Sequence, residues 1–144
     1  MDSESEVSPM IWTEVELTVA GGGAVQPVRV RFASDGTCFV EVVFESGEVI
    51  SGDGSDLFEA LSAARRRIEP SGLLLVCNGA RRNVFPSPML RQATIGRRAY
   101  ALKIPRTADR PPVVDIFEPA EEKEVCTVDE QLAWHSQWLA SGGV

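Results

Sequence analysis

The sequence predicts an α+β fold, with a single, mostly antiparallel sheet of about five to six strands and two main helices packed on one face. Apolar and polar residues alternate along three segments in the first third of the chain, which is the pattern of half-buried strands. Apolar residues recur at helical spacing after residues 56 and 127. The chain has 144 residues, 44% of them hydrophobic and 24% charged, which is typical of one globular domain. The expected order is β-β-β-α-β-(α)-β-β-α.

The three alternating segments are expected to form an antiparallel meander. Glycines at 21–23 and the pair Asp35-Gly36 supply the turns between them, because glycine accepts a positive φ at little cost. The predicted strands are Ile11–Val19, Val28–Phe32 and Cys38–Phe44.

The first helix is expected to follow a loop at Gly52–Asp56. Asp56 with Glu59 fits the capping-box pattern, and Ser55 is an equally good cap. Four apolar residues then form one face: Leu57, Leu61, Ala64 and Ile68. The triplet at 65–67, all arginine, is expected to be a solvated helix end, and Pro70 and Gly72 stop the helix.

The apolar run Leu73–Cys77 is typical of a strand that is buried on both faces, and is therefore expected at the centre of the sheet. A long loop with two prolines follows it. The remaining elements of this half are a short helix at Pro88–Thr94 and strands at Arg97–Ile104 and Val113–Phe117.

The last helix is expected to begin at Thr127, which with Glu130 matches the capping box. Its apolar stripe would contain Val128, Leu132, His135 and Leu139, with Trp134 and Trp138 to one side. Large aromatic side chains usually bury themselves in their own domain, but an exposed Trp134 would offer an anchor for a protein partner. Both tryptophans are therefore candidate partner-binding residues.

The net charge is −7, which disfavours general nucleic-acid binding. Residues 70–108 nevertheless hold seven bases and no acid, between two acidic segments. Residues 1–9 are predicted to form a flexible acidic tail, ahead of a single α+β domain at 10–141. The chain has no apolar run of membrane-spanning length, and its start lacks the order of a signal peptide. A cytoplasmic protein without membrane contact is expected.

Cys38, Cys77 and Cys126 are odd in number and widely spaced, and His135 is the only histidine. This pattern argues against a disulfide framework and against a zinc site. We expect free thiols, no metal site and no cofactor.

The arginine-rich loop after the buried strand is the strongest candidate ligand site. Arginine forks bind phosphate or carboxylate through two parallel hydrogen bonds, and amide or hydroxyl side chains can complete such a site. The alternative is that these arginines pair with carboxylates of the chain itself. The candidate anion-binding residues are Asn78, Arg81, Arg82, Asn83, Ser87 and Arg91.

The inventory of catalytic groups is thin. His135 lies in an apolar helix stripe, where a packed structural histidine is expected. A thiol that ends a buried strand, as Cys77 does, is inert unless a nearby cation lowers its pKa. Arg81 and Arg82 are close in sequence, so a Cys77–His135 pair stays open as an alternative. We predict no catalytic residue and no enzyme.

These observations favour a non-enzymatic protein-interaction domain, which would bind a protein partner or self-associate. Blocks of opposite charge steer complementary partners and favour self-association. The alternative is a small-ligand binder that holds a phosphate or carboxylate group through the loop at 78–98.

Several short stretches resemble a group of small uncharacterised bacterial proteins, chiefly actinobacterial. The stretches are Cys77–Ser87, Ala99–Leu102, Val114–Phe117 and Thr127–Gln131, and the resemblance spans roughly residues 55–140. It implies a whole bacterial protein rather than an excised module. It implies no activity and no site residue.

Overall fold

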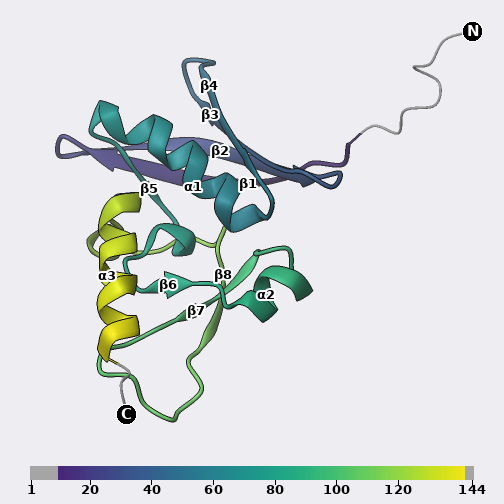
Figure 1. Cartoon of the computed structure of the whole chain (residues 1–144). Coiled ribbons are helices and arrows are strands. Elements are labelled where there is room, and N and C mark those ends of the chain that lie inside the picture. The colour runs from purple at the N-terminus through teal and green to yellow at the C-terminus, as the bar shows by residue number, and fades with distance from the viewer. Residues whose placement is uncertain (1–9, 142–144) are drawn as a thin grey trace, which may run out of the picture.

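The computed structural model describes residues 10–141, and the predicted tail at 1–9 lies outside the described residues. Within residues 10–141, eight strands and three α-helices form two packed parts (Figure 1). The strands are β1 (Thr13–Gly21), β2 (Ala24–Ser34), β3 (Cys38–Phe44), β4 (Val49–Gly54), β5 (Leu74–Val76), β6 (Val84–Phe85), β7 (Arg98–Ala101) and β8 (Val113–Asp115). The helices are α1 (Leu57–Ile68), α2 (Pro88–Ala93) and α3 (Val128–Ser141), with short 3-10 turns at Glu69–Ser71, Asn78–Ala80 and Glu122–Glu124.

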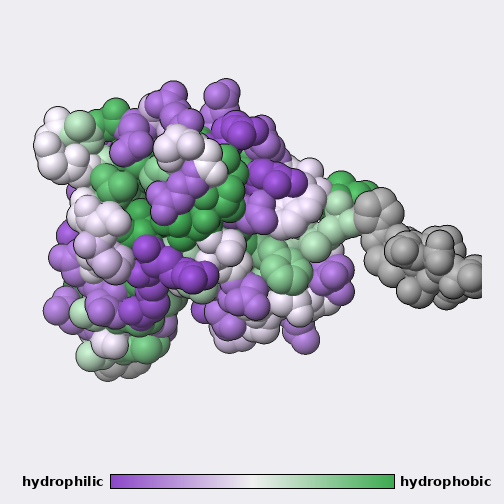
Figure 2. All heavy atoms as spheres, turned by 90° about the horizontal axis from the view of Figure 1, so that it is seen from above, coloured by the Kyte–Doolittle hydropathy of each residue, from purple (hydrophilic) through white to green (hydrophobic). Residues whose placement is uncertain are grey.

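The first part is a five-stranded antiparallel sheet in the order β4-β3-β2-β1-β5. The predicted meander is confirmed, since β1, β2 and β3 pair in sequence with Leu17 opposite Val28 and Val30 opposite Val42. These residues are buried, while their neighbours along the strands face outward. Seen from above, a patch of hydrophobic atoms is bordered by hydrophilic ones (Figure 2).

The segment expected to be a loop before α1 contains a strand, β4, which pairs with β3. A Cβ built on Gly52 would lie 2.6 Å from the carbonyl oxygen of Ala60, and one on Gly54 would lie 2.9 Å from the amide nitrogen of Ala60. The two glycines therefore let the helix backbone approach the strand closely. Sequence reasoning took them as turn residues, because glycine marks a turn and a close approach in the same way.

Helix α1 begins as predicted, with Asp56 as its N-cap accepting a hydrogen bond from the amide of Glu59 at 2.8 Å. The arginine triplet at its end is not wholly solvated. Arg66 and Arg67 are exposed, but Arg65 is only 1% exposed and lies on the same buried face as Leu61 and Ile68. Its position, four residues after Leu61, places it in the apolar stripe.

The fold is α+β with an antiparallel sheet, as expected, but the strands are divided between two sheets rather than gathered in one. A second, three-stranded antiparallel sheet has the order β6-β7-β8. The division arises just after β5, where the chain turns and the amides of Asn78 and Gly79 bond to the carbonyls of Glu118 and Ile116. Strand β5 is consequently at the edge of its sheet, pairing with β1 alone, and its burial comes from packing on its faces.

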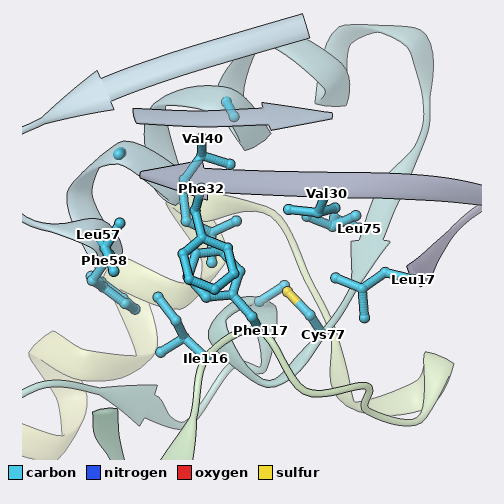
Figure 3. Close-up of a cluster of buried hydrophobic side chains, with 14 of the residues drawn as sticks. Leu17, Val30, Phe32, Val40, Leu57, Phe58, Leu75, Cys77, Ile116 and Phe117 are labelled. Atoms are coloured by element: carbon cyan, nitrogen blue, oxygen red, sulfur yellow. The ribbon is translucent and has the colours of Figure 1, made fainter. Parts of the chain in front are cut away.

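One hydrophobic cluster joins the two parts (Figure 3). At its centre the ring of Phe32 from β2 stacks on that of Phe117, which follows β8, with centroids 3.9 Å apart. Leu57 and Phe58 from α1 and Leu75 from β5 complete this region.

Helix α3 begins with the predicted capping box, in which Thr127 and Glu130 each accept a hydrogen bond from the other's amide. Its buried face differs from the predicted stripe. Leu132 and Leu139 are 46% and 54% exposed, whereas Gln131 is 1% exposed. The side-chain amide of Gln131 donates to the carbonyls of Gly79, Arg81 and Val84 and its oxygen accepts from Arg65. These bonds turn Gln131 inward and rotate the two leucines outward.

Candidate functional site

The described residues line a pocket of about 710 Å³ beside the second sheet. It lies between the end of β7, the loop that joins β7 to β8, and the carboxyl end of α3. In Figure 1 this loop runs below the sheet, at the opposite end of the molecule from the five-stranded sheet. The lining residues are Ser87, residues 100–103, residues 106–112 and Trp138.

Three cations line this pocket, and none of them forms an ion pair with any side chain of residues 10–141. They are Lys103, Arg106 and Arg110. All three are exposed, and Asp109 is the one acid in the lining. The pocket is therefore electropositive in a chain whose net charge is −7.

The walls of the pocket are mainly apolar. Tyr100 and Leu102 come from β7 and its end, Pro111 and Pro112 close the loop, and Trp138 comes from α3. The guanidinium of Arg106 lies over the Trp138 ring, with its central carbon 4.2 Å from the ring centroid. This cation–π contact ties the loop to the helix across the pocket.

Trp138 is the last of a series of aromatic rings that pack against one another and lead back into the core. The His135 ring lies 5.5 Å from that of Trp138 and 3.9 Å from that of Phe85, and Phe85 lies 5.3 Å from Phe58. Burial lowers the pKa of His135, and the positive charge of Arg91 lowers it further. The imidazole therefore serves as a neutral aromatic spacer near pH 7.

Five of the six residues that the sequence offered for an anion site have side-chain partners within the protein, and Arg82 is the exception among the described residues. Arg91 pairs with the carboxylate of Asp56 at 2.6 Å, and Arg81 pairs with Glu124 at 3.5 Å and with the Asn78 side chain at 3.4 Å. Arg97, in the same basic segment, pairs with Asp115. Arg81 and Arg91 therefore pair with carboxylates of the chain itself, as the alternative interpretation of the sequence expected.

The other members of that set have varied environments. The Asn78 and Asn83 side-chain amides donate to the carbonyls of Asp115 and Leu102, and Ser87 caps α2 through the amide of Leu90. Arg82 is exposed. Of the six, only Ser87 lines the pocket.

The two tryptophans proposed for partner binding are both half-buried and pack against the core. Trp134, the candidate anchor, lies three residues after Gln131 on the side of α3 that Gln131 turns inward, and it is therefore only half-exposed. Trp138 is the one that reaches the pocket.

Cys77 and His135 do not meet as a catalytic pair, since no hydrogen bond joins them among residues 10–141. Cys77 is fully buried, and burial raises the pKa of its thiol to about 11 despite the opposing charge of Arg65. The cation near it is thus Arg65 rather than Arg81 or Arg82. Within the described part of the chain, no group of three histidine, cysteine or acidic residues is arranged to hold a metal ion.

Sequence reasoning missed Tyr100, Lys103, Arg106 and Arg110 as site residues. Lys103 and Arg106 were counted in the basic segment, and the loop that holds them has prolines at 105, 111 and 112, which was a usable signal. The contact of Arg106 with Trp138 spans more than 30 positions of the chain, and no periodic pattern reports such a contact.

No protein-family model matches this chain, and no curated protein matches it in sequence. None of the helices in residues 10–141 has the length and apolar character needed to cross a bilayer.

Proposed function

We propose that this protein binds a small organic anion in the pocket between the β7–β8 loop and α3. The observation that carries the proposal is the group of three cations, Lys103, Arg106 and Arg110, which line an apolar hollow without acidic partners among the described residues. Elsewhere in the basic segment, Arg81, Arg91 and Arg97 are each neutralised by a carboxylate. Arg82 and Arg98 are exposed and form no ion pair among the described residues, but neither lines the pocket.

The dimensions of the pocket support this proposal. Its volume of about 710 Å³ falls within the roughly 300–1,000 Å³ that is usual for small-molecule sites. Such sites combine mostly apolar walls with a few charged or polar groups that orient the ligand. Arginine forks favour a carboxylate or phosphate as the anionic group.

Binding without catalysis is the form of activity that we propose. The groups in the lining that could act as a nucleophile or base are the hydroxyls of Ser87, Thr107 and Tyr100, the Lys103 amine and the exposed Asp109 carboxylate. No histidine or thiol of the described residues lies in the lining beside them to activate a hydroxyl. His135 lies behind Trp138, in the ring stack.

The experiment is a thermal-shift screen of carboxylates and phosphates, run on the wild type, on Arg106→Ala/Arg110→Ala and on Arg82→Ala as a matched control. A ligand at a hundred times its Kd stabilises the folded state by about 2.7 kcal/mol, which raises the Tm of a domain of this size by roughly 5–10 °C. We expect such a rise in the wild type and in Arg82→Ala, and its loss in the double variant. A rise that Arg82→Ala abolishes would instead place the anion at the sequence-predicted loop, and no rise at millimolar ligand would refute the proposal.

Self-association through α3 is a second candidate, in keeping with a protein-interaction domain. Leu132 and Leu139 are exposed and lie two helical turns apart, so they share one face. In an antiparallel pair of α3 helices related by a two-fold axis, Leu132 of one copy would meet Leu139 of the other. We expect a dimer by light scattering that Leu132→Lys converts to a monomer, and a monomeric wild type at 100 μM would refute this candidate.

A further inference from the structure

We infer that the ligand of this pocket is a planar aromatic anion, with a flat ring placed against Trp138 and a carboxylate or phosphate placed among the arginines. The inference rests on the proposed function and narrows it from any small organic anion to one chemical class.

The composition of the walls is the first argument. Neutral hydrogen-bonding side chains in the lining are limited to the hydroxyls of Ser87, Thr107 and Tyr100, and the Ser87 hydroxyl already caps α2. The remaining hydrogen-bonding side chains are charged, so a sugar or polyol body would compete with the anionic group for them, and each hydroxyl buried without a partner would cost binding free energy. A flat hydrocarbon ring has no such groups to satisfy.

The second argument is the shape of the aromatic surface. Trp138 presents a ring face at the pocket, where Arg106 now lies over it at 4.2 Å. Tyr100, Pro111 and Pro112 supply further flat or rigid apolar surface. Aromatic pairs in offset-stacked or edge-to-face arrangements, which the ring quadrupoles favour, contribute more than their buried area alone.

The third argument is that the Trp138 ring is held in place before the ligand arrives. His135 and Phe85 stack behind it, with interplanar angles of 16° for His135–Trp138 and 14° for Phe85–His135. The three rings are therefore nearly parallel, and the packing of Phe85 and His135 restrains the orientation of the Trp138 ring. A preorganised surface loses less entropy on binding than a mobile one.

Arg106 contacts the Trp138 ring and is also one of the cations proposed to bind the anionic group of the ligand. It is exposed and has no acidic partner among residues 10–141, so its guanidinium is available to turn from the Trp138 face toward an anion. The ligand ring then takes the place over the indole, while Arg106 and Arg110 bind the anion.

The test is calorimetric titration with five probes. Two carry ring and charge (2-naphthoate and 2-naphthyl phosphate), two carry charge alone (acetate and inorganic phosphate), and one carries the ring alone (2-naphthalenemethanol). We expect the first two to bind at least tenfold more tightly than the other three, and the tighter of them identifies the anion. In NMR spectra the indole N–H signal of Trp138, assigned with Trp138→Leu, is expected to shift more than those of Trp12 and Trp134.

Variants separate the ring from the charge. Arg106→Gln keeps an exposed polar side chain and is expected to weaken 2-naphthoate binding at least tenfold, whereas Arg82→Ala leaves it unchanged. Trp138→Leu is also expected to weaken 2-naphthoate binding at least tenfold. Circular dichroism verifies that this variant is folded.

The outcomes distinguish this inference from the proposed function. If acetate or phosphate binds as tightly as its naphthyl counterpart and the binding needs Arg106, the proposed function stands and the aromatic inference is overturned. If 2-naphthalenemethanol binds as tightly as 2-naphthoate, or no probe binds at millimolar concentration, both are overturned.

Discussion

Replacing Arg65 with leucine is expected to cost this protein a large part of its stability. The Arg65 guanidinium is 1% exposed and donates to the Cys126 carbonyl at 2.7 Å, to the Gln131 side-chain oxygen at 2.6 Å and to the Gly79 carbonyl at 3.2 Å. The Glu69 carboxylate lies 3.8 Å away. This one side chain therefore connects α1, α3 and the turn after β5.

The magnitude follows from the groups that the substitution leaves behind. The Gly79 carbonyl keeps its bond from Gln131, but the Cys126 carbonyl and the Gln131 oxygen lose the donor that Arg65 provides. Each buried acceptor left without a donor costs about 1–3 kcal/mol. The half-buried Glu69 carboxylate loses a cation but keeps its bonds from the Val128 amide, so it adds little to this cost. We expect a loss of about 3–5 kcal/mol, against a typical total of roughly 5–15 kcal/mol.

The assay is urea unfolding followed by circular dichroism, with the free energy of unfolding taken from the midpoint at an unchanged slope. Arg66→Leu is the matched control, because the neighbouring arginine is exposed and its ion pair with Asp129 lies on the surface. Such pairs contribute about 0–1 kcal/mol. The reasoning is refuted if Arg65→Leu costs less than about 1 kcal/mol, or if the two variants lose equal stability.

Two further predictions concern the packing of α1 on β4 and the protonation of His135. Gly52→Ala is expected to destabilise the fold by at least about 2 kcal/mol, because overpacking costs roughly 1–3 kcal/mol and the new methyl group would meet rigid backbone at Ala60 and Ala64. Ser51→Ala, whose side chain is exposed, serves as its control in urea unfolding, and an unchanged midpoint for Gly52→Ala would contradict the observed close approach. Since the pKa of His135 is lowered in the folded state, the unfolded chain binds more protons than the folded one as the pH falls through about 6.5. The stability that His135 contributes is therefore present above that pH and lost below it. Melting temperatures measured between pH 5 and 7.5 are expected to fall more steeply in the wild type than in His135→Phe, and parallel curves would disprove the assignment.

Several local features could be predicted from the sequence because neighbouring residues determine them. The meander follows from the alternation of Leu17, Val28 and Val30, and both helix starts follow from their caps at Asp56 and Thr127. Strand β4 was missed because Gly52 and Gly54 resemble a turn until a helix is seen packed against them. The division into two sheets was missed because it depends on main-chain bonds from residues 78 and 79 to residues 118 and 116.

For the candidate site, the sequence by itself determined which charges the chain carries and that residues 70–108 hold bases without acids. Only the tertiary structure decided which of those bases are neutralised. Asp56 reaches Arg91 and Glu124 reaches Arg81 across long separations in the chain, while no described carboxylate reaches Arg106. Pairing of charges depends on distance in space, and a hydrogen-bonded polar residue such as Gln131 can rotate a helix against its apolar stripe. Composition and spacing along the chain contain neither kind of information.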